Sequence, residues 1–250
     1  MELFQVKLAE NSKEVEAAQR LRFEVFNIEM KKGLASSYAT GLDCDAFDPL
    51  CDHILIIDTK TNQTIGTYRL LLKSRLGALG HFYSETEFDL ENIKKLEGEI
   101  MEMGRSCVHK DYRRNAIVYL LWNKILEYVR DHQVCYIVGC PSVYETDPAH
   151  IAKIYTLMKE KYFAPQAFRV YPKKDKGLPE LKGHVDIAGQ EKKIFLQLPS
   201  LMRSYLKTGA FVCGPPALDD EFGTVDFFMC LEVKNISKGY LGRLRVGGDL

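Results

Sequence analysis

Glu102 and Arg105 stand three positions apart within the largely apolar run from Glu99 to Val108. A carboxylate such as Glu102 can accept a proton from an attacking nucleophile, and Arg105 can orient a substrate. Residues three apart in a regular strand point to opposite faces, so the two can cooperate only where the strand is broken. Gly104, between them, is a position where a β-bulge forms easily. The alternative is a structural ion pair at a sheet edge.

Charged side chains also occur in the polar loop before the predicted hairpin and in the second strand of that hairpin. Asp45 and Asp48 lie three apart in the polar segment 31–51, and Arg69 lies in the run 64–72. Two carboxylates that face an arginine can bind a substrate ammonium group, or they can simply hold the loop in place. For this group, organisation of a site is favoured over direct catalysis.

A basic pair, Arg113 and Arg114, opens a strongly periodic helical segment. Backbone N–H groups at a helix N-terminus bind phosphate, and an adjacent arginine adds charge. Cations are disfavoured at that end unless an anion joins them, which favours an anion site over a solvated helix start. The four residues 113–116 include no glycine for close approach of a pyrophosphate. His109 is an alternative general base, although a lone histidine after a strand is more often structural.

Cys107, on the same strand as Glu102, is a candidate nucleophile. No histidine or aspartate partner stands at a meaningful position, and a cysteine within a strand usually serves packing, so covalent catalysis is rejected. The seven cysteines form no Cys-x-x-Cys pair, which predicts reduced thiols in a cytosolic compartment. The six histidines do not cluster with them at ligand spacing, so no metal site is expected.

Composition and charge exclude several classes of protein. Hydrophobic residues make up 46% of the 250 residues, which is ordinary for a globular protein. The 34 basic residues equal the 34 acidic ones in number, which argues against a protein that binds nucleic acid through an excess of positive charge. No secretory signal and no run of 18 apolar residues is visible. The sequence therefore predicts a cytoplasmic protein, and peripheral contact with the inner face of the membrane is left open.

The elements that must position these residues alternate between strands and helices. Asn11 and Glu14 resemble a capping box that opens a helix, with Val15, Ala18, Val25 and Ile28 on its apolar face. Residues 60–63 indicate a hairpin turn. Further helices are predicted at 84–96, 113–131, 148–161 and 198–207, and strands at 3–8, 53–58, 64–72, 99–108, 134–140 and 225–233. This order predicts one α/β (α+β) domain over residues 1–250, with a mixed sheet flanked by helices and an exposed excursion at about 173–193.

Several sequence blocks carry a resemblance to a known superfamily. The stretch from Met101 to Val129 sits where GNAT acyltransferases have a strand, a phosphate loop and a helix. LRFEVFNIEM, DCDAFD, TYRLL and EMGRSCV follow in an order similar to that of two sister groups, the acyl-homoserine-lactone (autoinducer) synthases and the ornithine-lipid or N-acyl amino acid synthases, often labelled hemolysin-like. FYSETEFD, LWNKI and GPPALDDEFGTVDF resemble the second group. The resemblance covers roughly residues 21–228 and implies a single GNAT-like domain with a splayed sheet.

The resemblance implies that a fatty acyl group, including 3-hydroxy acyl chains, passes from a thioester to the amine of a small amino acid such as ornithine or glycine. The implied donor is acyl carrier protein, whose phosphopantetheine arm has one phosphate and no adenosine diphosphate to bind; acyl-CoA is the alternative co-substrate, and no permanently bound cofactor is expected. Competing functions are an acetyl-CoA-dependent acetyltransferase, an autoinducer-type synthase and a membrane-associated hemolysin-like protein.

The residue roles that the resemblance implies extend the groups above. The family's Glu-x-x-Arg pattern maps onto Glu102 and Arg105, and its acidic pair and arginine onto Asp45, Asp48 and Arg69. Arg22 and Phe26 would lie on a helix that covers the donor, and Asp226 could contact the amine. Arg113 and Arg114 would bind the donor phosphate or the carrier protein. The backbone N–H groups of Cys107 and Val108 would stabilise the oxyanion.

Overall fold

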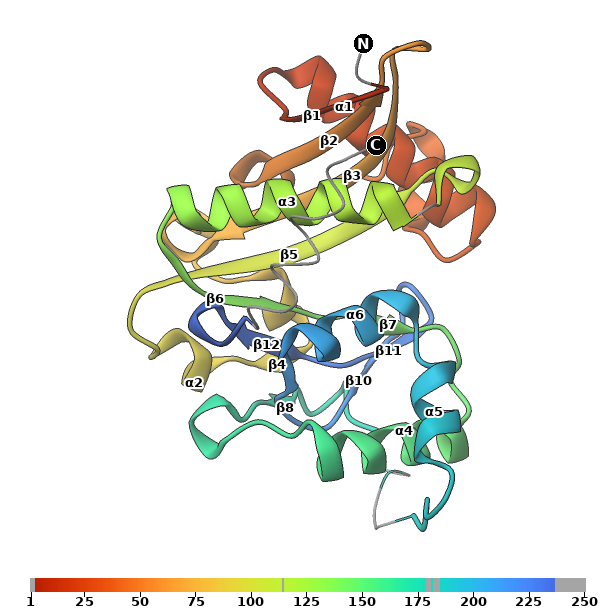
Figure 1. Ribbon diagram of the computed structural model, residues 1–250, viewed down its shortest axis with the longest axis vertical. Helices are drawn as coiled ribbons and strands as arrows, with labels where there is room; N and C mark the ends of the chain where they lie inside the picture. The colour runs from red at the N-terminus through yellow and green to blue at the C-terminus, as the bar shows by residue number, and fades with distance from the viewer. Residues whose placement is uncertain (1–2, 114, 179–180, 182–184, 237–250) are drawn as a thin grey trace. The chain divides into compact units, whose positions relative to one another are not determined.

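The computed structural model describes residues 3–113, 115–178, 181 and 185–236 (Figure 1). These form two compact units. The first contains residues 3–80 and 99–134, and the second contains residues 81–98 and the described residues from 135 to 236. Among the described residues, no helix is both long and apolar enough to cross a membrane.

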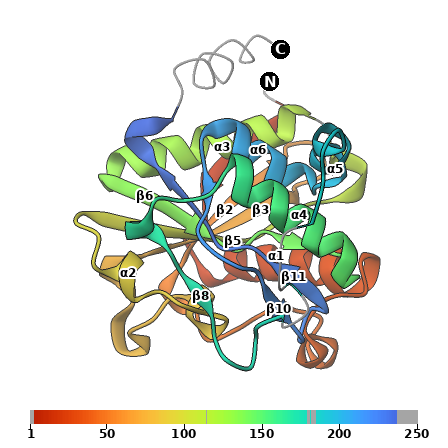
Figure 2. The same ribbon diagram turned by 90° about the horizontal axis from the view of Figure 1, so that it is seen from below.

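The first unit is built on an antiparallel sheet with two helices against it. The strands lie in the order β1 (Phe4–Leu8), β2 (Asp52–Asp58), β3 (Gln63–Leu72) and β5 (Glu99–Val108). β2 and β3 form the hairpin that the sequence predicted, and the other strands pair with them in antiparallel register. Figures 1 and 2 show α1 (Ser12–Phe23) on one face of this sheet and α3 (Asn115–Asp131) on the other.

Helix α1 begins as predicted but does not continue as a regular α-helix. The Asn11 side chain accepts a hydrogen bond from the backbone N–H of Glu14, whereas the Glu14 carboxylate binds Lys7 and the backbone N–H of Glu10. A π-helical turn follows at Glu24–Glu29. Because its wider turn changes the helical phase, the placement of Ile28 on the apolar face was wrong: this side chain is 55% exposed.

The strands of the second unit pair in three groups. β6 (Val134–Gly139), β12 (Met229–Glu232) and β9 (Phe211–Val212) form one; β10 (Ala217–Asp219), β11 (Thr224–Asp226) and β7 (Ser142–Val143) form another; β4 (Phe88–Asp89) pairs with β8 (Tyr171–Pro172). Its helices are α2 (Glu91–Lys94), α4 (Pro148–Lys161), α5 (Glu191–Gln197) and α6 (Ser200–Thr208).

Two predicted elements of the second unit were wrong. Residues 84–96 do not form one helix, because Phe88 and Asp89 pair with β8 and leave only a short helix at Glu91–Lys94. The predicted strand 225–233 is interrupted at Phe227, whose N–H bonds to the carbonyl of Pro141. The break lets β11 and β12 pair with different neighbours.

The segment 173–193 lies partly outside the described residues. In its described part, Lys176 pairs with Asp220 and Gly177 forms an isolated bridge to Ala217. Ile187 is buried. The single-domain organisation over residues 1–250 stays a prediction.

Candidate active site

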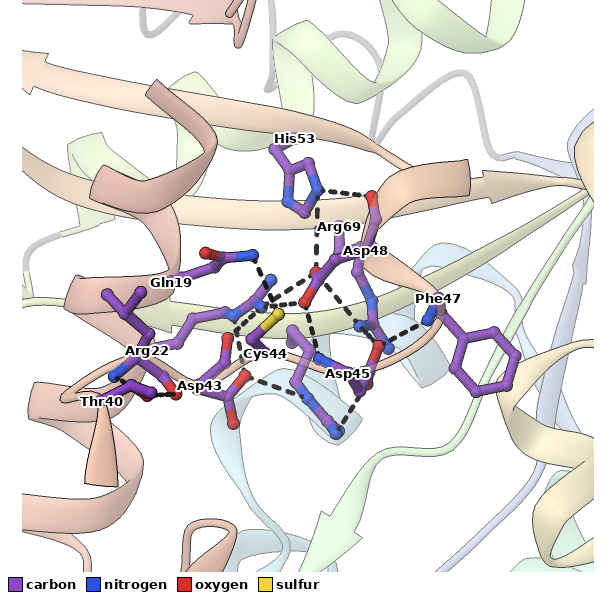
Figure 3. Close-up of polar contacts among 12 residues, drawn as sticks. Gln19, Arg22, Thr40, Asp43, Cys44, Asp45, Phe47, Asp48, His53 and Arg69 are labelled. Atoms are coloured by element: carbon purple, nitrogen blue, oxygen red, sulfur yellow. Dashed lines mark hydrogen bonds and ion pairs between the residues drawn. The ribbon is translucent and has the colours of Figure 1, made fainter. Parts of the chain in front are cut away.

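The first unit holds a buried network of arginines and aspartates, which is called the Arg–Asp network below. Its arginines come from α1, β3 and β5, and its aspartates come from one loop, residues 43–48. The members are Arg22, Arg69, Arg105, Asp43, Asp45 and Asp48. Figure 3 shows the loop carboxylates turned toward the arginine side chains. Four separate segments of the chain therefore meet at one set of charges.

Arg22 is the most enclosed member of the network. Its side chain is fully buried, with Nε 2.8 Å from Asp43 Oδ1 and Nη2 2.9 Å from both carboxylate oxygens of Asp48. Its Nη2 also donates to the backbone carbonyl of Asp43. Burying a charge is costly unless opposite charges and hydrogen bonds compensate it. Arg22 can therefore be buried on α1 only because the loop of residues 43–48, the acidic loop, packs against it.

Arg69 and Arg105 share the carboxylate of Asp45. Arg69 Nη1 lies 2.7 Å from Asp45 Oδ1, and Arg105 Nη2 lies 3.1 Å from Asp45 Oδ2. Arg69 also reaches Asp48 Oδ1 at 3.3 Å, and Arg105 Nε lies 3.4 Å from Asp43 Oδ1. The predicted association of Asp45, Asp48 and Arg69 is thus present, and Arg105 joins it.

The network keeps its carboxylates ionised despite burial. Burial raises the pKa of Asp48, but Arg22 and Arg69 outweigh that effect and lower it to about 2. Burial likewise opposes ionisation of Asp45, and Arg69 and Arg105 bring its pKa below the ordinary value. These side chains are poor proton acceptors near neutral pH, so the network fits a positioning role better than acid–base catalysis.

Sequence reasoning missed two residues of this region, Asp43 and His53. Asp43 belongs to the quoted block DCDAFD but was not selected, because nothing local distinguishes it from its acidic neighbours. His53 begins the buried part of β2, and its Nε2 lies 3.3 Å from the carbonyl oxygen of Asp48. Burial, with a contribution from Arg22, lowers the pKa of His53, although Asp48 opposes the shift.

The pH dependence of stability follows from these shifts. The folded protein holds the His53 pKa below 6.5, so below that pH the unfolded chain binds a proton that the folded chain does not. The free energy of unfolding should therefore fall as pH drops through 6.5. A second fall, from Asp48, should occur between pH 3.8 and about 2.

Urea denaturation at a series of pH values tests this expectation. In His53→Gln the first fall should be reduced while the second remains. His150→Gln, which changes a histidine of α4 in the second unit, serves as the control. An unchanged pH profile in His53→Gln would contradict the role given to His53.

A β-bulge in β5 explains how Arg105 reaches the network. Between the pairs Thr67–Cys107 and Arg69–Gly104, one residue of β3 faces two residues of β5, and Arg105 has a φ of 51°. A non-glycine residue in this left-handed region is uncommon. Regular alternation would turn Arg105 away from the face of Arg69, whereas the two side chains bind the same carboxylate. The predicted break in the strand is confirmed, one residue beyond Gly104.

Glu102 lies on β5 before the bulge and is buried. It pairs in register with Leu71, two residues after Arg69 on β3. Residues two apart in a strand share a face, so Glu102 projects on the same face of the sheet as Arg69. The bulge therefore brings the two members of the Glu-x-x-Arg pattern to one face, as their cooperation requires. The ion pairs of Arg105 with Asp43 and Asp45 make Arg105 a member of the Arg–Asp network.

Cys107 and Phe26 belong to an apolar cluster beside α1. Buried Leu21, Val25 and Cys107 pack together, with Phe26 against them. Burial raises the pKa of the Cys107 thiol, which keeps it protonated and agrees with the rejection of covalent catalysis. The placement of Phe26 beside the end of β5 is compatible with its predicted position over the donor.

The turn between β5 and α3 carries the predicted phosphate-binding residues. Arg113 Nε donates to the carbonyl of Val108 at 3.0 Å, and its Nη atoms bind the carboxylate of Glu29 at 2.6 and 2.7 Å. His109 accepts a hydrogen bond from the N–H of Asp111 through Nδ1 at 3.4 Å, which favours a structural role. Arg114 lies outside the described residues.

Asp226 lies in the second unit within a group of three buried carboxylates. One carboxylate oxygen from each of Glu87, Asp219 and Asp226 lies within 4.8 Å of the other two. Asp226 also accepts a hydrogen bond from the Thr224 hydroxyl at 2.9 Å. The contact of Asp226 with the amine substrate stays a prediction.

Comparison with known proteins agrees with this architecture. A family described as "Acetyltransferase (GNAT) domain" matches residues 21–123. The solved acyl-homoserine lactone synthase BjaI, described as CoA-dependent, superposes with a TM-score of 0.57 at 13% identity, over 99% of this chain and 91% of that one. FeeM, an N-acyl amino acid synthase from uncultured soil microbes, gives a TM-score of 0.51 at 12% identity, over 93% of both chains. The fold is the predicted GNAT-like α/β fold of acyltransferases.

A curated protein from Rhodobacter capsulatus, named L-ornithine N(alpha)-acyltransferase, is 30% identical over 245 residues, which cover 94% of this chain and 92% of that protein. The chain belongs to this family of N-acyltransferases.

Proposed function

We propose that the protein transfers a fatty acyl group from the thioester of acyl carrier protein to the α-amine of ornithine or a similar small amino acid. The observation that carries this proposal is the β5 bulge, which puts Arg105, with the rest of the Arg–Asp network, on the same face of the sheet as Glu102. The near full-length similarity to a protein named for ornithine acylation supports the choice of acceptor.

The proposed reaction is direct aminolysis of the thioester. The amine nitrogen attacks the thioester carbon while Glu102 takes the proton that the nitrogen loses, directly or through a water molecule. The new C–N bond forms, the C–S bond breaks, and the sulfur leaves as a thiolate, which takes the proton back from Glu102 or from solvent. The backbone N–H of Val108 would stabilise the oxyanion of the tetrahedral intermediate, because successive N–H groups of a strand point to opposite sides and Cys107 pairs with Thr67 of β3. The network holds the acidic loop against β3 and β5, which fixes the shape of the site.

Acyl carrier protein is proposed as the donor for two reasons. The residues 113–116 lack the glycines that allow close approach of a pyrophosphate. Arg113, which precedes α3, offers one guanidinium group, which suits the single phosphate of a phosphopantetheine arm. The main competing donor is acyl-CoA, since BjaI, which has a similar fold, is described as CoA-dependent.

A matrix of donors and acceptors tests both halves of the proposal. Purified protein is incubated with acyl carrier protein or coenzyme A carrying acetyl, long-chain or 3-hydroxy acyl groups, each with ornithine, glycine and other amino acids. Mass spectrometry of the products should show long-chain N-acylornithine from the carrier protein, formed far faster than any acetyl-CoA product. Equal or faster turnover with acetyl-CoA would establish the acetyltransferase function instead.

A further inference from the structure

Glu29, the last residue of the π-helical turn, binds the guanidinium group of Arg113. Both carboxylate oxygens accept hydrogen bonds from the two Nη atoms, at 2.6 and 2.7 Å. The third nitrogen, Nε, is held by the carbonyl of Val108 at the end of β5. The sheet therefore sets the direction of the guanidinium group, and its two terminal nitrogens are directed at Glu29.

The pair is accessible to solvent rather than built into the core. The Arg113 and Glu29 side chains are 44% and 33% exposed. Hydrogen bonding to Arg113 lowers the pKa of Glu29 more than burial raises it, and Lys110 and His109 add to the lowering. Glu29 is therefore fully ionised near neutral pH. An exposed ion pair of this kind is weak enough to open.

A phosphate group offers an arginine the same pair of oxygens that a carboxylate offers. The donor phosphate and the Glu29 carboxylate would therefore compete for the two Nη atoms of Arg113. While Glu29 is bound, the fraction of protein ready to accept a phosphate is reduced, and the apparent affinity for the donor falls by the same factor.

We propose that Glu29 competes with the donor phosphate for the guanidinium group of Arg113, and so lowers the apparent affinity for the acyl donor until the phosphate displaces it. The proposal rests on the proposed function, because it takes Arg113 as the contact of the donor phosphate. The π-helical turn is what supplies the carboxylate: one extra residue in the turn alters the direction in which Glu29 projects.

The test measures equilibrium binding of 4′-phosphopantetheine and of pantetheine, which lacks the phosphate, to the protein. Glu29→Gln should bind 4′-phosphopantetheine about 1.5- to fivefold more tightly than the parent protein, the range expected from releasing an exposed ion pair. Its affinity for pantetheine should not change. Glu16→Gln is the matched control, because it removes the same charge from an exposed glutamate–arginine pair on α1. Its affinity for both ligands should equal that of the parent.

Arg113→Gln separates failure of this inference from failure of the proposed donor site. If Arg113→Gln leaves 4′-phosphopantetheine binding unchanged, Arg113 is not the phosphate contact and the donor site itself is wrong. If Arg113→Gln weakens binding but Glu29→Gln does not strengthen it, the donor site stands and the role of Glu29 is overturned. Equal tightening of pantetheine in Glu29→Gln would also overturn it, since the effect would not depend on phosphate.

Discussion

The variant Glu102→Gln is expected to fold normally and to turn over about 10²- to 10⁴-fold more slowly than the parent protein, the usual contribution of general acid–base catalysis. Glutamine is nearly isosteric and can still form hydrogen bonds, so the buried position on β5 should tolerate it. Raising the pH should recover part of the loss, because a larger fraction of the amine is then already deprotonated. Rate and melting temperature are measured on the same preparation.

Glu99→Gln is the control for this experiment. Glu99 lies on the same strand, where its carboxylate accepts hydrogen bonds from the N–H groups of Ser74 and Ile100, outside the proposed site. It should leave turnover near the parental value. A Glu102→Gln protein that is less stable but fully active would contradict the base assignment. The base would then be His109, or the substrate itself would assist the reaction.

The variant Arg22→Met is expected to lower the free energy of unfolding by about 3–5 kcal/mol, the typical cost of removing one partner of a buried ion pair. Methionine fills much of the space but leaves the carboxylates of Asp43 and Asp48 without this partner. Urea denaturation at neutral pH measures the loss. The deficit relative to the parent should shrink in acid, because the pKa of Asp48 rises once Arg22 is gone and a protonated carboxyl costs less to bury.

Arg20→Met on the same helix provides the comparison. Arg20 pairs with Glu16 at 2.7 Å, and both side chains are about half exposed. Breaking such a surface pair should cost at most about 1 kcal/mol. Equal losses in the two variants would mean that the Arg–Asp network contributes no more than a surface ion pair.

The sequence predicted the parts of the site that depend on local patterns. The strand 99–108 and a break near Gly104 follow from an apolar run that contains a glycine between two charges, and both are present. The grouping of Asp45 and Asp48 with Arg69 came from the family resemblance and is present as well.

The features of the site that the sequence did not predict depend on contacts between segments that are distant in the chain. Asp43 and Asp45 cannot be told apart in the sequence. The packing of α1 against the loop determines that Asp43 forms the ion pair with Arg22 Nε. The pair of Glu29 and Arg113 joins residues 84 positions apart, after a π-helical turn that periodicity does not reveal. The predicted helix 84–96 failed for a similar reason: the short β4–β8 pairing prevents a long helix there.

The composition of the Arg–Asp network also constrains the order in which the first unit folds. The segment 31–51 contains only short 3₁₀ turns, so it has little local structure that could form early. Its aspartates find their partners only after α1, β3 and β5 have come together, since each of these elements supplies one arginine. Closing such long loops costs chain entropy before any ion pair forms. We therefore expect the loop of residues 43–48 to take its final position late in folding, after α1, β3 and β5 have packed together.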